Sequence, residues 1–526
     1  MFEIIERLLQ GSNQRTEADI QSDVRQLILT APFALDEAQV VSLEAQIGDR
    51  RRIDIEVGST VIEVKRDIRP GRVRQNALEQ LSGYVTTRRD QTNQRYVGVL
   101  TDGIRWVCYD LQQGELRPVT DFTLSHVGEA DRLVVWLEGV LATTHEIQPT
   151  VQAIQARLGA GSSAYALDRA SLAAIYTAYG HEPTVQMKRQ LWSRLLTSAL
   201  GTQFEDTDEL FIEHTLLVNS AEIIAHAVLG LNVEVLSPAS LLSGQRFDES
   251  GIYGVVEPDF FDWIVEVEGG ETFIRTLARR LARFDWSEVE QDVLKVLYES
   301  IIGPDTRKRL GEYYTPDWLA EAVVAESLPN PLSTRALDPA CGSGTFLFHA
   351  VRAYIAAAEA ARQSLPVLLE GVTSHVLGMD LHPVAVTLAR VTYILAIGRT
   401  RLLDPSRQTI QIPVYLGDSL QWQEQNLDLW SAGNLVIHAD DNGELFTSDL
   451  RFPSTLLENA SRFDQLVNEM AGRASARQPG AAIPSLNAVF QRFAIPENDR
   501  GTLNGTFETM CRLHDEGRDC PPSAPM

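Results

Sequence analysis

The segment that most constrains the fold is residues 335–350, Arg-Ala-Leu-Asp-Pro-Ala-Cys-Gly-Ser-Gly-Thr-Phe-Leu-Phe-His-Ala. It predicts a short apolar strand that ends at Asp338, a tight turn containing Gly342 and Gly344, and a helix that begins near Thr345. Glycines let the backbone approach a ligand closely, and a helix N-terminus favours a carboxylate or phosphate. This order of elements predicts an α/β domain whose ligand lies at the carboxyl end of a parallel sheet.

Two further predicted strands end near carboxylates. Residues 375–380 end at Asp380, and a third apolar run leads into Asp418. Because the carboxyl ends of parallel strands meet at one edge of a sheet, we expect both residues to lie near Asp338. An acidic residue at the end of the second strand typically binds ribose hydroxyls. The alternative for each of the three is ordinary capping of the following helix.

The first of these segments resembles the S-adenosylmethionine motif of N6-adenine DNA methyltransferases, and residues 310–317, Leu-Gly-Glu-Tyr-Tyr-Thr-Pro-Asp, resemble the cofactor motif that precedes it. The resemblance spans roughly residues 306–425 and implies a Rossmann-like domain that binds S-adenosylmethionine. Residues 313–316 would surround the methionine end of the cofactor, residues 338–344 its amino and carboxylate groups, Asp380 the ribose and Asp418 the adenine. The implied cofactor-binding residues are Tyr313, Tyr314, Thr315, Pro316, Asp338, Pro339, Ala340, Cys341, Gly342, Ser343, Gly344, Asp380, Leu381, Asp418 and Ser419.

The catalytic loop of that family, Asn/Asp/Ser-Pro-Pro followed by an aromatic residue, does not occur in the sequence. Asn330-Pro331-Leu332 lacks the second proline, and residues 519–523 contain an intruding cysteine and no aromatic residue. We therefore expect an incomplete, C-terminally truncated methyltransferase that binds the cofactor and is inactive alone. A second polypeptide would supply the catalytic loop and the target-recognition domain.

Residues 52–65 predict a β-hairpin that turns at Gly58 and Ser59. In that register Asp54 lies opposite Glu63. Two facing carboxylates repel each other, and a divalent cation between them would remove the repulsion. The alternation along the hairpin predicts one apolar face made of Ile53, Ile55, Val57, Ile62 and Val64.

This hairpin resembles the core of PD-(D/E)xK nucleases, although Ile53 replaces the proline of the motif. Asp54 and Glu63 are the candidate Mg²⁺ ligands, and Lys65 would orient or activate a water. Glu17 would add a carboxylate, and Gln80 with Tyr84 matches the Gln-x-x-x-Tyr feature of some restriction nucleases. The candidate catalytic residues of the nuclease are Asp54, Glu63, Lys65, Glu17 and Gln80; the alternative is a surface hairpin with a mixed-charge face.

The sequence predicts a multidomain α/β protein. Between the two α/β patterns, apolar residues recur at helical spacing. An aromatic-rich stretch at residues 251–263 is interpreted as core or as an interdomain contact, with a wedge inserted into DNA as the alternative. The predicted domains are 1–125, a PD-(D/E)xK nuclease-like domain; 126–305, a helical connector; 306–430, the S-adenosylmethionine-binding part of an incomplete methyltransferase domain; and 431–526, an incomplete C-terminal region or insertion.

Composition narrows the class of function. A net charge of −25 argues against a protein that coats nucleic acid nonspecifically. The 4 cysteines lack the spacing of a disulfide framework or a zinc site, and no apolar run is long enough to span a membrane, which favours the cytoplasm.

Taken together, these features favour an adenine-N6 DNA methyltransferase of a restriction–modification or phage-defence system, acting on double-stranded DNA and fused to a Mg²⁺-dependent nuclease. The alternative is a non-catalytic cofactor-binding or DNA-sensing subunit completed by a second polypeptide. An RNA or protein methyltransferase is disfavoured by the link to a nuclease-like domain.

Overall fold

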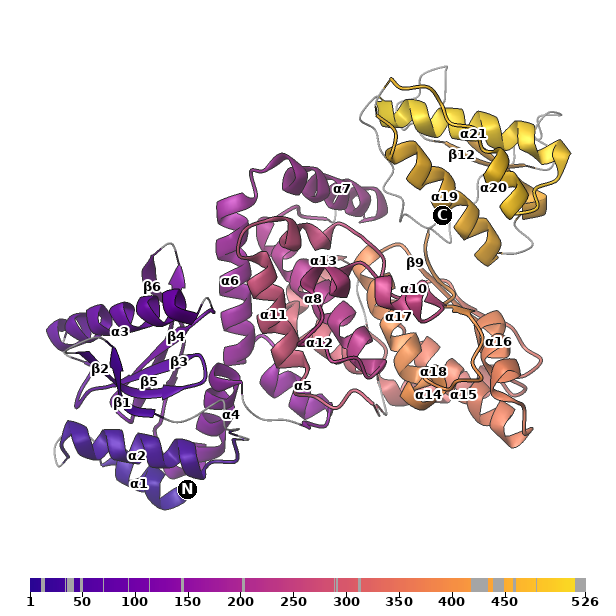
Figure 1. Cartoon of the computed structure of the whole chain (residues 1–526). Coiled ribbons are helices and arrows are strands. Elements are labelled where there is room, and N and C mark those ends of the chain that lie inside the picture. Colours follow the sequence, from indigo (N-terminus) through magenta and orange to yellow (C-terminus); the bar gives the residue numbers. More distant parts are fainter. Residues whose placement is uncertain are drawn as a thin grey trace. The chain divides into compact units, whose positions relative to one another are not determined.

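The computed structural model divides the chain into two compact units, residues 1–414 and 415–526 (Figure 1). The residues described are 1–10, 15–33, 35, 42–47, 51–69, 71–92, 94–112, 114–142, 146–200, 204–287, 289, 292–310, 314–417, 434–438, 449–456, 460–478 and 480–515.

The N-terminal part of the first unit is a six-stranded sheet in the order β1-β2-β3-β4-β5-β6. All neighbouring strands are antiparallel except β3 and β4, which are parallel and are connected through the helix α3 (Gly71–Thr92). Parallel neighbours need such a crossover. The strands are β1 (Ser42–Ile47), β2 (Arg51–Val57), β3 (Thr60–Val64), β4 (Val97–Thr101), β5 (Arg105–Gln112) and β6 (Glu115–Thr123).

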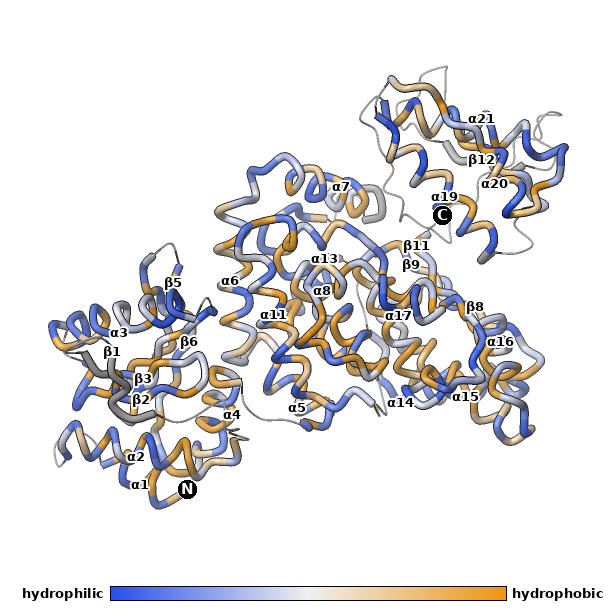
Figure 2. The backbone as a smooth tube through the Cα atoms, in the orientation of Figure 1, coloured by the Kyte–Doolittle hydropathy of each residue, from blue (hydrophilic) through white to orange (hydrophobic). Residues whose placement is uncertain are grey.

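Two apolar clusters contain the buried apolar residues of this sheet. One includes Val57, Val64 and Val99 together with residues of α1 (Phe2–Leu9), α2 (Glu17–Thr30) and α4 (Ala130–Leu141). The other includes Leu100 and Tyr109 with the buried residues of α3. Much of α3 is hydrophilic in Figure 2, because only one stripe of this helix is buried. The sheet is therefore covered by helices and can hold side chains rigidly at its strand ends.

The predicted hairpin is present. Val57 pairs with Thr60 across the turn, and Gly58 has a φ of +54°, a conformation that glycine adopts without strain. The prediction of one shared apolar face is wrong for Ile53, which packs in the cluster on the α3 side, whereas Ile55 packs in the other cluster. The described ladder between β2 and β3 runs only from Val57↔Thr60 to Ile55↔Ile62, so cross-strand pairing does not enforce the alternation at Ile53.

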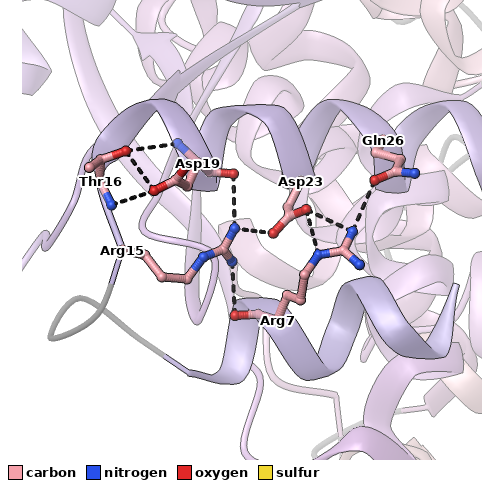
Figure 3. A network of polar contacts seen from close by, with 6 residues as sticks. All are labelled: Arg7, Arg15, Thr16, Asp19, Asp23 and Gln26. Carbon is pink, nitrogen blue, oxygen red and sulfur yellow. Dashed lines mark hydrogen bonds and ion pairs between the residues drawn. The ribbon is translucent and has the colours of Figure 1, made fainter.

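Helices α1 and α2 are joined by a polar network (Figure 3). Asp23 on α2 is buried and accepts hydrogen bonds from Arg7, at 2.8 Å, and from Arg15. Thr16 and Asp19 form a capping box that starts α2, with Thr16 N donating to Asp19 at 2.9 Å. This network fixes the beginning of α2, where Glu17 lies.

The middle of the first unit is helical, as the sequence predicts. Its central helix, α8, is buried along nearly its whole length. The aromatic stretch is core, as interpreted: Trp263 is fully buried and donates to Thr215 Oγ1 at 3.2 Å. The main helices are α5 (Val151–Arg157), α6 (Ser163–Tyr179), α7 (Pro183–Leu200), α8 (Asp208–Val228), α9 (Pro238–Leu242), α10 (Gln245–Glu249), α11 (Gly270–Leu281) and α12 (Val293–Ile301), with the short 3-10 helix η4 (Phe261–Glu266).

The remainder of the first unit is the second α/β pattern. Its strands β8 (Ala336–Asp338) and β9 (Val376–Asp380) form a three-stranded sheet with β11 (Val414–Leu416), which begins at the last residue of the unit, in the order β11-β9-β8. Strands β8 and β9 are parallel, as expected from the sequence. The helices are α13 (Pro304–Leu310), α14 (Asp317–Ser327), α15 (Thr345–Ala360), α16 (Leu365–His375), α17 (Pro383–Ile397) and α18 (Arg399–Leu402); β10 (Ile410–Gln411) pairs with β7 (Ile252–Tyr253).

The second unit has an apolar core of its own. Phe452, Met470 and Phe507 are members of this core. Its elements are β12 (Asn434–His438), β13 (Asp449–Pro453), α19 (Ala460–Ser475), α20 (Asn487–Arg492) and α21 (Glu497–Asp515). In the ranges described for both units, every helix is too short or too polar to cross a membrane.

Candidate functional site

Asp338 and Asp380 lie at the carboxyl ends of the neighbouring parallel strands β8 and β9, as the sequence predicts. Asp338 Oδ1 accepts a hydrogen bond from Ala340 N at 3.3 Å, whereas its Oδ2 is buried and has no hydrogen-bond partner among the described residues. Asp380 accepts from Gly342 N and from His382 N, both at 2.8 Å. The strand end, the glycine turn and the start of α17 are thereby joined at one point.

Both carboxylates have a raised pKa. Burial raises the pKa of both, and the negative charge of Asp380 raises the pKa of Asp338 further. A buried carboxylate is stabilised in its charged form by hydrogen-bond donors or a positive charge. This end of the sheet therefore favours a ligand that presents hydroxyl donors or a positive charge such as an ammonium group.

The glycines of the turn serve two different purposes. Gly342 has a φ of +55°, and among the described residues a Cβ atom added there would have only a ring carbon of Tyr314 near it, at 3.9 Å. Gly344 has a φ of +94°, and an added Cβ would come within 3.1 Å of Ala389 Cα on α17. Gly344 therefore permits close packing of α15 on α17, whereas Gly342 leaves space in front of Tyr314.

The segment that precedes the strand also reaches this region. Tyr314 lies with its ring centroid 5.3 Å from that of Tyr298 on α12, and Thr315 O accepts a hydrogen bond from Lys295 Nζ at 2.8 Å. Pro316 is exposed at the start of α14. Three residues of the predicted site, Tyr313, Asp418 and Ser419, lie outside the described residues.

The other predicted cofactor-binding residues differ in exposure. Pro339 and Ala340 are exposed, Leu381 is half-buried and Ser343 is buried. Cys341 is buried, and burial together with the nearby aspartates raises the pKa of its thiol well above the usual range. Such a thiol is a poor nucleophile, so Cys341 fills space in the turn.

Sequence reasoning missed Asp292, which lies beneath the glycine turn. Asp292 Oδ2 accepts hydrogen bonds from Ser343 Oγ at 2.9 Å and from Thr345 Oγ1 at 2.8 Å. The only signal in the sequence is an aspartate directly before an amphipathic helix, which indicates a helix cap and nothing more.

The N-terminal candidate residues also come together in part. Lys65 Nζ lies 2.6 Å from Glu63 Oε1 and 3.4 Å from Glu17 Oε1. Asp54 Oδ2 accepts from Val64 N at 2.8 Å. Gln80 is exposed on α3 and has no hydrogen bond to the other four within the described part of the chain.

Glu63 is the most unusual member of this group. It is 2% exposed, and its Oε2 has no hydrogen-bond partner in the described ranges. Burial, followed by the charge of Asp54, raises its pKa to about 7. Among the residues described, no group of three or more histidine, cysteine, aspartate or glutamate side chains is placed to hold a metal. The charges of Asp54 and Glu17 both act on Glu63 and raise its pKa.

Comparison with known proteins identifies one stretch of the chain. Residues 289–414 match the model of a family described as N-6 DNA methylase, so the chain carries a domain of that family. The match begins before Asp292 and includes α12, which lies within the range predicted as the helical connector. No curated protein sequence matches the chain.

Three solved structures show low similarity to the chain. A cryoEM structure of a DrdV–DNA complex is 15% identical, with a TM-score of 0.31, and covers 80% of this chain and 40% of that one. A nuclease-deletion mutant of the Type ISP restriction-modification enzyme LlaGI, in complex with a DNA substrate mimic, is 11% identical. Its TM-score is 0.30, and the match covers 68% of this chain and 28% of that one. The type IIG restriction endonuclease BpuSI is 16% identical, with a TM-score of 0.24, and the match covers 72% of this chain and 40% of that one. The chain spans less than half the length of each.

Proposed function

We propose that the end of the β8–β9 sheet binds S-adenosylmethionine and that the chain belongs to an adenine-N6 DNA methylation system of the restriction–modification or phage-defence type. The observation that carries this proposal is the pair Asp338 and Asp380 at adjacent strand ends, joined by the glycine turn. This pair lies inside the stretch that matches the N-6 DNA methylase family.

The residues present fit this cofactor. The buried Oδ2 of Asp338 has no partner among the residues described, so it can accept from an ammonium group such as that of the methionine moiety. The space at Gly342 would admit the methionine end of the cofactor in front of Tyr314. Each oxygen of Asp380 retains a lone pair for a ribose hydroxyl beside its backbone bond. When bound, the cofactor would supply an electrophilic methyl group.

We further propose that double-stranded DNA is the macromolecular partner and that methyl transfer needs a catalytic loop that residues 1–526 do not contain. Transfer to the N6 amine of adenine requires a flipped base held in a pocket, and the tetrapeptide that forms this pocket in the family does not occur in the sequence. With such a loop supplied by the same or by another polypeptide, the chain would take part in methyl transfer; without it, the chain would act as a non-catalytic unit that binds the cofactor. Mixing the chain with DNA and a labelled methyl donor separates these two roles.

Calorimetric titration with S-adenosylmethionine tests the binding site. Asp338→Asn keeps the side-chain volume and removes the charge, so we expect the affinity to fall by about tenfold or more, the effect of losing a charge-assisted hydrogen bond. Glu370→Gln, an exposed charge on α16, is the matched control and should leave the affinity unchanged. Equal affinities of the wild type and Asp338→Asn would remove the assignment.

A second candidate function is Mg²⁺-dependent DNA cleavage by the N-terminal sheet. The observation that favours it is the buried Glu63 Oε2, which has no partner in the described ranges and lies near the charge of Asp54. A hard divalent cation prefers such carboxylate oxygens. Lys65, close to both Glu63 and Glu17, would orient a water at the cation.

Cleavage of plasmid DNA in Mg²⁺ or Mn²⁺ tests this second function. Glu63→Gln keeps the shape of the side chain and removes a metal ligand, so we expect a loss of activity on the order of 100-fold. Glu79→Gln on the exposed face of α3 is the control. A nuclease signal that survives in Glu63→Gln would come from a contaminant or from another site and would rule out this assignment.

A further inference from the structure

Asp292 is a buried carboxylate that accepts hydrogen bonds from four donors among the described residues. It caps α12 and is 2% exposed. Besides the hydroxyls of Ser343 and Thr345, it accepts from Lys295 N at 2.9 Å and from Thr392 Oγ1 at 3.3 Å. Burial of a carboxylate is costly unless hydrogen bonds compensate it, and here both of its oxygens are compensated.

The donors come from three separate elements. Ser343 and Thr345 belong to the glycine turn and the start of α15, Thr392 to α17, and the backbone donor to α12 itself. Burial raises the pKa of Asp292, and the hydrogen bonds from Lys295 N, Thr345 and Ser343 oppose that shift. One side chain therefore joins the turn to the two helices packed beneath it.

The same helix end also holds the second cofactor segment. Lys295, one turn along α12 from Asp292, is largely buried and donates from Nζ to Thr315 O at 2.8 Å. The turn at 342–344 and the segment at 314–316 are thus both anchored to the first turn of α12. A movement of this helix end would displace both segments.

We propose that Asp292 is a positioning residue for the methyl donor. It acts through Ser343 and Thr345, which hold the turn so that Gly342 N points to Asp380. This inference rests on the proposed cofactor site and adds to it an anchor outside the recognisable motif. Removal of the acceptor releases two hydroxyls of the turn and lowers the affinity for S-adenosylmethionine by about 10- to 100-fold, as expected for the loss of one or two charge-assisted hydrogen bonds.

The test measures the affinity for S-adenosylmethionine by calorimetry and the melting temperature without ligand, on the full chain. Asp292→Asn is compared with Asp285→Asn, a matched control whose carboxylate accepts from Ser287 in a nearby loop. We expect Asp292→Asn to bind at least about tenfold more weakly, whereas Asp285→Asn binds like the wild type. A purely structural role would lower the melting temperature of Asp292→Asn and leave its affinity unchanged, which overturns the proposal.

Ser343→Ala supplies a second variant, because it keeps Asp292 and removes one donor. It should weaken binding severalfold, and the double variant with Asp292→Asn should lose less than the sum of the two single losses, since both changes break the same contact. Additive losses would overturn the proposal even if Asp292→Asn is poorly folded. If the wild type itself does not bind S-adenosylmethionine, the proposed function fails. If the wild type binds and both variants bind with the same affinity, the positioning role alone fails.

Discussion

Glu222 illustrates how a single buried residue sets a response to pH. It lies on α8 and is 2% exposed, and its Oε2 has no hydrogen-bond partner in the part of the chain that is described. The side-chain nitrogen and oxygen of Asn219, one turn earlier on α8, are also buried and have no hydrogen-bond partner among the described residues. Burial, and then the charges of Asp259 and Asp262, raise the pKa of Glu222 well above its usual range.

This raised pKa has a definite sign for stability. In the folded state Glu222 binds its proton more tightly than in the unfolded chain, so folding is favoured at low pH and loses stability as the pH rises through the folded-state pKa. Glu222→Gln removes the titrating group. We expect its melting temperature to rise relative to the wild type between pH 5 and pH 8, with the difference largest at the alkaline end.

Differential scanning fluorimetry across this pH range checks the expectation. Glu209→Gln, an exposed acid in the first turn of α8, is the control and should show a difference that does not grow with pH. A difference between Glu222→Gln and the wild type that stays constant with pH would mean that Glu222 does not titrate as its burial requires.

At the level of single residues, sequence reasoning reached Asp338 and Asp380 because each ends a predicted strand next to a local motif. It did not reach Asp292, because the partners of Asp292 are 51, 53 and 100 residues further along the chain. An aspartate before a helix has the same local appearance whether it caps only that helix or also binds distant hydroxyls. Contacts between distant segments are set by packing, which local patterns do not encode.

At the level of elements, short-range patterns were sufficient for the turn of the N-terminal hairpin. Glycine at a positive φ and the alternation around it fixed the pairing of Val57 with Thr60. The alternation failed at Ile53, beyond the described end of the ladder with β3. Gln80 lies on α3 as expected, but the buried stripe of that helix consists of Ala77, Leu81, Tyr84 and Val85, which leaves Gln80 exposed.

The parallel strands β8 and β9 were predicted correctly for the same short-range reason. Strand β8 ends at Asp338 and helix α15 begins at Thr345, so the pattern of apolar residues and glycines determines strand, turn and helix start locally. The order of strands in the sheet and the packing of α12 beneath the turn depend on tertiary contacts. These features became visible only in the three-dimensional structure.

At the level of the whole molecule, the described apolar clusters of residues 1–414 and of residues 415–526 share no members. A ligand that binds only the folded form of one unit stabilises that unit. At a concentration of about 100 times Kd, S-adenosylmethionine should add about 2.7 kcal/mol to the stability of the first unit. Differential scanning calorimetry should therefore show a shift in the transition of that unit.

Asp338→Asn provides the control for this calorimetric measurement. In this variant the added S-adenosylmethionine should shift the transition far less, because the site has lost an acceptor for the ligand. A shift of equal size in the variant and the wild type would indicate that the ligand stabilises the protein at some other place.

The hydrogen bonds of Asp292 have a practical consequence for protein engineering. Consider a fragment that starts at residue 306 and is transplanted into another enzyme as a cofactor-binding module. It would contain both recognisable cofactor motifs but would lack Asp292, which accepts hydrogen bonds from Ser343 and Thr345. A sequence alignment of such a chimera would show complete cofactor motifs, but we expect its affinity for S-adenosylmethionine to be low. Recombination partners of this module should be joined upstream of residue 289, where the family match begins.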